Sequence, residues 1–271
     1  MRGLIAGAYV SAVAVAMACN QPDSNPHDVI ALEIDTAPAP SIVAGDTMRI
    51  GDDTTLGRLH AVAFNIKKDS LPVSILWLTL DPLVVTTDTF GHVYAGTDSI
   101  PSTPRVVAQA GGLQSLPFNL QIVPRPDSVA RDTTDSVQHL NFCKTLPVSA
   151  GFDANLFHKS TLPDSVGTPV AVGSYLMHWA IVSPASLVGK QTGTIADTGL
   201  IAYVADASGN PSILDTTKSG VSTRVLIFGA SALAKHDSTF SVTVQATARY
   251  QGRQLHNPVQ VTITFLNPSK C

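Results

Sequence analysis

Hydrophobic and polar residues alternate over most of this chain, with the two-residue period of β-strands. In the clearest run, 240–250, Phe, Val, Ala and Tyr residues occupy every second position and Ser, Thr, Gln and Arg residues occupy the others. After a turn around Gly252, the run 259–265 repeats the alternation. Because all apolar side chains of such a run lie on one face, we predict a long antiparallel hairpin with one buried face.

Other segments of strand length share this alternation, and 18 prolines and 19 glycines separate them. The further predicted strands are 29–34, 60–66, 74–80, 92–95, a pair formed by 106–107 and 118–122, and then 175–182, 199–204 and 223–228. No long stretch keeps the period of an amphipathic helix. The pattern therefore predicts an all-β fold, with two β-sandwiches in tandem.

Two polar, proline-bearing stretches divide the chain. We interpret 19–28 as a flexible tether and 124–138 as a linker, which leaves domains at 29–123 and 139–271. The second domain is larger because of an expansion near 204–238, which contains turn signals at 206–211 and 215–220. Loops on a rigid sandwich are common binding sites, so this expansion is a candidate site. An extra hairpin or a solvated loop is the alternative.

The N-terminus has the pattern of an export signal. A short basic start is followed by an apolar run from Leu4 to Ala18, which is too short to span a bilayer. The residues Ala16-Met17-Ala18-Cys19 resemble the lipobox of bacterial lipoproteins, whose cysteine is diacylated and becomes the new N-terminus. The resemblance implies a signal peptide at 1–18 and lipidation of Cys19, and Asn20 favours the outer membrane. An ordinary signal peptide cut near Ala18 is the alternative.

Two further cysteines, Cys143 and Cys271, bracket the second domain. Export would place them in an oxidising compartment, where a disulfide persists. We predict that they form a bridge, which would stabilise the domain by about 5 kcal/mol in the chain-entropy model. The bridge would join the first strand of the domain to its C-terminal tail. Two unpaired thiols are the alternative.

One tryptophan falls in each predicted domain. In both cases three residues follow the tryptophan, and then come a short polar residue and a proline. The runs are Trp77-Leu78-Thr79-Leu80-Asp81-Pro82 and Trp179-Ala180-Ile181-Val182-Ser183-Pro184. We predict that both tryptophans are core residues, because a large aromatic residue within an alternating strand is usually a packing centre.

The first of these runs continues with Val84-Val85 and Gly91-His92-Val93. Together these residues resemble the bacterial immunoglobulin-like domains of group 2, whose signature is a core Trp, a polar-Pro turn, a valine pair and a Gly-x-Val strand. The resemblance implies an Ig-like sandwich over about 95 residues. The second domain shares Trp179 and Ser183-Pro184 but departs from the pattern by its expansion.

Charge and composition exclude several classes of protein. With 17 basic and 20 acidic residues, the chain has a net charge of −3 and lacks the basic excess of a nucleic-acid binder. A hydrophobic fraction of 44% is too high for a disordered chain, and three cysteines are too few for a disulfide-dense miniprotein.

Candidate catalytic and metal-binding motifs are missing from the sequence. It contains no Gly-x-Ser-x-Gly, Ser-x-x-Lys, Cys-x-x-Cys or His-x-His, so we predict no enzyme, no cofactor and no metal. His178 should point to the opposite face of its strand from Trp179, toward solvent. Acidic loops could bind calcium, although none has the spacing of a calcium loop, and solvated carboxylates are the alternative. They are Asp52-Asp53-Thr54, Asp88-Thr89, Asp98 and Asp132 to Asp135.

The sequence thus favours a non-enzymatic lipoprotein of the cell envelope. Its Ig-like modules would serve as spacer, adhesion or assembly elements that bind a protein or glycan, with the membrane as partner through the lipid. The alternative is a carbohydrate-binding module protein of an envelope polysaccharide system. That class would need exposed aromatic residues, and only 6% of this chain is aromatic. A hydrolase would need a nucleophile, base or metal that the sequence does not supply.

Overall fold

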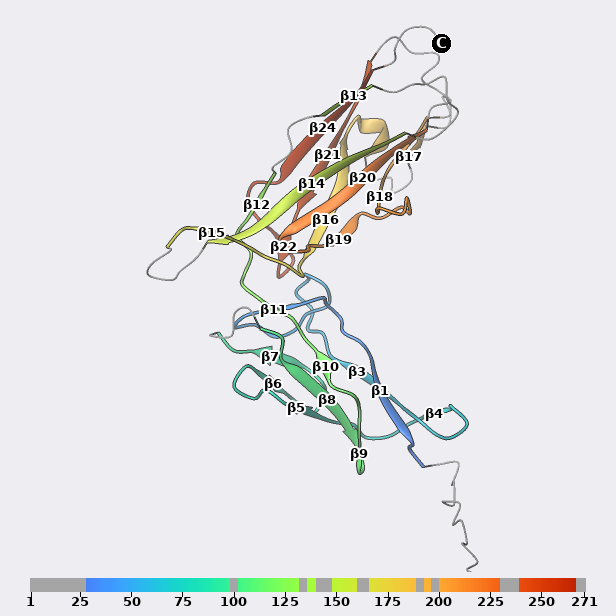
Figure 1. The fold of residues 1–271 in the computed structure, drawn as a ribbon, viewed down its shortest axis with the longest axis vertical. Coiled ribbons are helices and arrows are strands. Elements are labelled where there is room, and N and C mark those ends of the chain that lie inside the picture. The colour runs from blue at the N-terminus through green and yellow to red at the C-terminus, as the bar shows by residue number, and fades with distance from the viewer. Residues whose placement is uncertain are drawn as a thin grey trace, which may run out of the picture.

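The computed structural model consists of β-strands around two hydrophobic cores, one in each half of the chain (Figure 1). It describes residues 28–97, 102–131, 136–139, 148–159, 166–188, 193–195, 200–229 and 239–266. The predicted all-β fold is confirmed. The helical element in these ranges is a single 3-10 turn, η2 (Ala185–Leu187), and they contain no helix long and apolar enough to cross a membrane.

The N-terminal domain is built from short strands in four small sheets. One sheet contains β1 (Ala31–Thr36), β3 (His60–Phe64) and β4 (Ser70–Leu71), and another contains β5 (Leu76–Thr79), β8 (Arg105–Ala110), β9 (Leu113–Gln114) and β10 (Phe118–Asn119). Two pairs complete the domain: antiparallel β6 (Val85–Thr87) with β7 (Val93–Ala95), and parallel β2 (Ile42–Val43) with β11 (Ile122–Val123). Their apolar faces enclose a core that includes Trp77, which is 7% exposed.

The C-terminal domain has two larger sheets. The first contains β12 (Ser128–Ala130), β14 (Val148–Lys159), β20 (Val221–Gly229), β18 (Leu200–Ala205) and β17 (Gly193–Ile195) in that order, with β15 (Pro169–Ala171) beside β14. The second contains β13 (Ser136–His139), β24 (Val259–Leu266), β21 (Thr239–Thr247), β16 (Leu176–Ser183) and β19 (Leu214–Thr216). The small hairpin β22 (Arg249–Tyr250) and β23 (Arg253–Gln254) follows β21.

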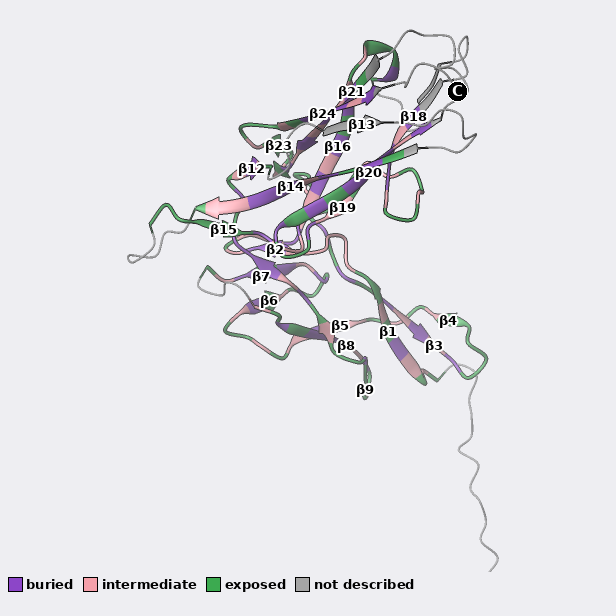
Figure 2. Ribbon diagram, turned by 45° about the horizontal axis from the view of Figure 1, so that its top comes forward, coloured by how far each residue is buried: buried purple, intermediate pink, exposed green. Residues whose placement is uncertain are grey.

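Buried positions alternate with more exposed ones along the strands of these two sheets (Figure 2), and the buried side chains form the C-terminal core. Trp179 is 1% exposed, and its ring meets the edge of Phe152 with the centroids 4.8 Å apart. Phe228 stacks on Phe265 at 4.5 Å. The hairpin predicted at 240–265 is confirmed as β21 and β24, which pair antiparallel with Val242, Val244 and Ile263 fully buried.

The segment 124–138, predicted to be a linker, carries two strands instead, so that prediction is wrong. β12 pairs antiparallel with β14, and β13 pairs parallel with β24, so the segment belongs to the C-terminal sheets. Only 124–127 separates β11 from β12, and Pro124 and Pro126 within it are buried. Three- and four-residue strands are too short to show a period among polar residues, and they form because longer strands offer them an edge.

Two other strands differ from the sequence prediction. β14 was not predicted, although Ala150, Phe152, Ala154 and Leu156 alternate along it and are buried. The predicted strand 118–122 is broken between β10 and β11, which pair with β8 and β2 in different sheets.

The described part of the expansion at 204–238 is folded as sheet rather than as a long loop. A turn at 206–210 leads into β19, which adds to the edge of β16. This agrees with an extra strand pairing, the alternative to a displayed loop. Residues 230–238 lie outside the described residues.

A close contact explains the glycine of the Gly91-His92-Val93 run. Gly91 has a φ of +87°, which L-residues rarely adopt. A Cβ at this position would lie 2.8 Å from Nε1 of Trp77 and 2.9 Å from the carbonyl oxygen of Leu59. The glycine therefore lets the backbone pass directly over the edge of the core tryptophan.

We expect Gly91→Ala to destabilise the protein by about 2–4 kcal/mol, because the new methyl group combines a positive φ with a clash against Trp77 and Leu59. Urea unfolding followed by tryptophan fluorescence measures this. Gly112→Ala is the matched control, since a Cβ at Gly112 meets nothing within 4 Å. Equal unfolding midpoints for the two variants would show that the contact at Gly91 is not needed.

Candidate functional site

The two domains share the parallel pair β2–β11. Ile42 lies opposite Ile122, and Val43 lies opposite Val123. Successive side chains of a strand point to opposite faces. Accordingly, the two isoleucines belong to the N-terminal core and the two valines to the C-terminal core. The pair is a layer common to both cores, and the domains are packed directly on one another.

Asp52 joins the domains at one side of this layer. Nε2 of His178, on β16, donates to Oδ2 of Asp52 at 2.6 Å, and the N–H of Gly252 donates to the backbone oxygen of Asp52 at 2.8 Å. The side chains of Asp52 and His178 are 11% and 23% exposed. The prediction that His178 faces solvent is therefore wrong, because the loop that carries Asp52 covers that face of β16.

Asp46 receives donors from both domains. Its carboxylate accepts from Arg49 Nε at 3.0 Å in its own domain, and from Gln251 Nε2 at 3.0 Å and Tyr250 Oη at 3.2 Å in the C-terminal domain. Burial acts to raise the pKa of Asp46, but the hydrogen bonds from Arg49 and Gln251 outweigh it, and the pKa lies below its ordinary value of 3.8. The ionised carboxylate thus holds three side chains at the junction.

Two tyrosines complete the contact surface of the C-terminal domain. Tyr175 is buried, and its hydroxyl donates to the carbonyl oxygen of Arg249 at 2.6 Å. Burial raises the pKa of Tyr175 and also that of Tyr250, where nearby Asp46 adds to the effect. Both hydroxyls are therefore protonated donors at neutral pH. The guanidinium of Arg125, from the connection 124–127, lies 4.7 Å from the ring centroid of Tyr250.

A cleft of about 700 Å³ opens along this junction and is the candidate binding site. Both domains and the connection between them supply its walls. The lining residues are Arg49, Thr54, Arg125, Pro126, Asp127, Tyr250, Gln251, Arg253, Gln254, Leu255 and His256.

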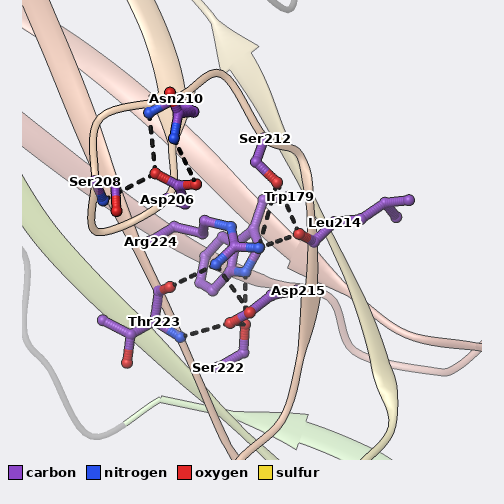
Figure 3. Close-up of polar contacts among 10 residues, drawn as sticks. All are labelled: Trp179, Asp206, Ser208, Asn210, Ser212, Leu214, Asp215, Ser222, Thr223 and Arg224. Carbon is purple, nitrogen blue, oxygen red and sulfur yellow. Dashed lines mark hydrogen bonds and ion pairs between the residues drawn. The ribbon is translucent and has the colours of Figure 1, made fainter. Parts of the chain in front are cut away.

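A second polar cluster lies within the expansion of the C-terminal domain and reaches Trp179 (Figure 3). Trp179 Nε1 donates to Ser222 Oγ at 2.8 Å, and Ser222 Oγ donates to Asp215 Oδ2 at 2.7 Å. Arg224, 7% exposed, pairs with Asp215 at 2.8 Å and donates to the carbonyl oxygen of Leu214. These bonds tie β19 to β20 and to the core tryptophan, so the cluster fixes the expansion in place.

The acidic loops considered as calcium sites have other partners where they are described. Asp52 accepts from His178, and Asp53 accepts from the backbone N–H of Thr54. Asp88 accepts from both the ring Nδ1 and the backbone N–H of His92. The described residues contain no group of three or more His, Cys, Asp or Glu side chains arranged to hold a metal ion. Asp98 and the run 132–135 lie outside them.

Of the other predicted site residues, some are described by the structure and some are not. Trp77 and Trp179 lie in the two cores. The lipidation site Cys19 and the disulfide pair Cys143 and Cys271 lie outside the described residues, as does the signal peptide.

Sequence reasoning missed the junction residues. Asp52 and His178 are 126 positions apart, and Asp46 and Tyr250 are 204 apart, so no local pattern links them. The available signal was indirect: Asp52 lies in an acidic loop and Gly252 in a predicted turn, and segments of this kind connect strands at the ends of a domain.

Comparison with known proteins adds distant matches. No family model and no curated protein matches the chain. Among solved structures, domains 4 and 5 of the S-layer protein SbsC match at 16% identity and a TM-score of 0.27, over 87% of this chain and 96% of that one. The Yersinia pseudotuberculosis adhesin InvE matches at 16% and 0.28, over 86% and 58%, and the D00-D0 domain of Intimin at 14% and 0.26, over 87% and 98%.

We expect Asp52→Ala to loosen the junction, because it removes the acceptor of a partly buried charged hydrogen bond and leaves His178 without it. The expected loss is about 1–3 kcal/mol of stability. Small-angle scattering should show a larger radius of gyration than in the parent protein. Asp53→Ala is the control, because the side chain of Asp53 bonds within its own turn. If the two variants scatter alike, the ion pair does not hold the domains.

Proposed function

We propose that this chain is a non-enzymatic lipoprotein of the cell envelope, in which two directly packed sandwiches act as a stiff spacer that presents a binding surface. The observation that carries the proposal is the β2–β11 layer, whose side chains belong to both cores. A chain built to hold two modules at a fixed angle keeps a surface at a set distance from its attachment point. The lipid at Cys19 would provide that attachment, and the outer membrane is the proposed location.

The short connection between the domains supports this proposal. Pro124 and Pro126 fix two of its four φ angles and are buried, and β12 joins the C-terminal sheet at once. A flexible tether between modules would instead be polar and exposed. The stiffness needed by a spacer thus arises from the chain's own packing.

The second candidate is a carbohydrate-binding module protein of an envelope polysaccharide system. The observation that favours it is the polar cleft of about 700 Å³ at the junction, with Tyr250 in its wall. Both candidates need an exported protein without catalytic groups, and a spacer can carry such a module.

The disulfide remains a proposal with support from strand register. β13 and β24 run parallel, with His139 opposite Leu266. Cys143 follows four residues after His139, and Cys271 follows five residues after Leu266. Two segments of nearly equal length that leave one end of a parallel pair can meet, which is the condition for a bridge between their ends. It would close the C-terminal sandwich at the end far from the junction.

Replacement of Cys19 by Ser should move the protein from the membrane fraction to the soluble fraction, because the thiol that carries the lipid is gone. Fractionation of bacterial cells followed by immunoblotting measures this. Cys143→Ser is the control and should stay with the membranes. Unchanged partition of the Cys19 variant would refute the anchor.

Alkylation tests the bridge. In exported protein that is unfolded without reductant, Cys143 and Cys271 should resist iodoacetamide, and both should be alkylated after reduction, as read by mass spectrometry. Cys271→Ser should make Cys143 reactive without reduction. Two reactive thiols in the unreduced parent protein would exclude the pairing.

A further inference from the structure

The junction cleft differs in charge from the rest of the protein. Three guanidinium groups line it, from Arg49, Arg125 and Arg253, in a chain of net charge −3. The carboxylate in the lining, Asp127, is engaged at its edge, where Oδ2 lies 3.1 Å from His158 Nδ1 and accepts from the N–H of Lys159 at 2.9 Å. The lining of the cleft therefore favours a negatively charged ligand.

The three arginines have different roles. Arg49 is committed to the protein, because it donates two bonds to Asp46 and a third to the carbonyl oxygen of Thr54. Arg125 and Arg253 are exposed at the cleft wall. Arg125 is oriented by the face of Tyr250, so its planar fork is held in place before any ligand arrives.

The groups around these two arginines suit a sugar acid. A guanidinium can donate two parallel hydrogen bonds to one carboxylate. This geometry favours a planar carboxylate over an anion that accepts a single hydrogen bond. Thr54 and Gln254, both exposed in the lining of the cleft, add hydroxyl and amide groups of the kind that bind sugar hydroxyls. A volume of about 700 Å³ lies in the range of ligand sites.

We propose that the junction cleft binds a carboxylated glycan, through Arg125 and Arg253 on its uronate groups. A ligand that also reaches Thr54 would touch both domains at once, so binding would also stiffen the junction. This inference deepens the binding part of the proposed function and rests on it. It does not depend on the lipid anchor, so membrane fractionation of the Cys19 variant and glycan binding can fail separately.

Calorimetric titration of the full chain in detergent tests the site with three probes. Tetragalacturonate carries rings and carboxylates, its methyl ester carries the rings alone, and tetraglutamate carries the carboxylates on a peptide. We expect binding of tetragalacturonate, at least tenfold weaker binding of the other two, and weaker binding at high salt. Equal binding of tetraglutamate would assign the cleft to acidic peptides, and failure to bind tetragalacturonate would overturn the proposal.

Variants locate the binding. Arg253→Ala, at an exposed hairpin position, should weaken tetragalacturonate binding at least tenfold, and so should Arg125→Ala. Arg58→Ala, an exposed arginine of the N-terminal domain outside the cleft, is the control and should bind as the parent does. Parent-like affinity in the Arg253 variant, or an equal loss in the Arg58 variant, would refute the assigned site. Circular dichroism of each variant checks that it is folded.

Discussion

The architecture depends on a parallel pair of two-residue strands whose two faces are both buried in hydrophobic cores. Ile42 and Ile122 face one core, and Val43 and Val123 face the other. Burial of an aliphatic side chain is worth about 1.5–3 kcal/mol relative to exposure, so separation of the domains would lose much of the contribution of both valines. The strict two-residue period of the backbone allows so short a segment to serve two cores.

Polar contacts around this layer orient the two domains, which the apolar contact alone holds together. Asp46 and Asp52 both come from the N-terminal domain, and their partners Tyr250, Gln251 and His178 come from the C-terminal domain. Hydrogen bonds to charged acceptors depend on geometry more strongly than apolar packing does. The valines therefore hold the domains together, and the two aspartates fix the angle between them.

The strand pattern was predictable where a strand is long and half-buried. The run that became β21 and β24 could be read residue by residue, because one face is apolar and the other polar. β14 escaped prediction although Ala150, Phe152 and Leu156 alternate, because Gly151, Asp153 and Asn155 between them are poor strand residues. Pairing with the neighbouring strands β20 and β12 accommodates them. β12 and β13 escaped for a similar reason, since their neighbours stabilise them.

The candidate site was predictable only in its parts. Turns at Asp52-Asp53 and at Gly252 could be recognised, but nothing in the sequence shows that one turn lies on the other. Their contact depends on the order and register of many strands. Each strand can pair in more than one way, so the contact cannot be inferred from the two turns alone. Gly91 is a different case, because it lies in the same short stretch of sequence as Trp77, and the close contact between the two explains why this position is a glycine.

The shared layer also sets an order for folding. Val43 and Val123 belong to the first half of the chain, but the core that covers them includes residues of β21 and β24, which are synthesised later. The N-terminal half thus cannot bury these two valines until β21 and β24 have been synthesised, and until then it presents an apolar edge. Apolar surface of this kind makes an incomplete chain prone to aggregation and is the surface that chaperones cover.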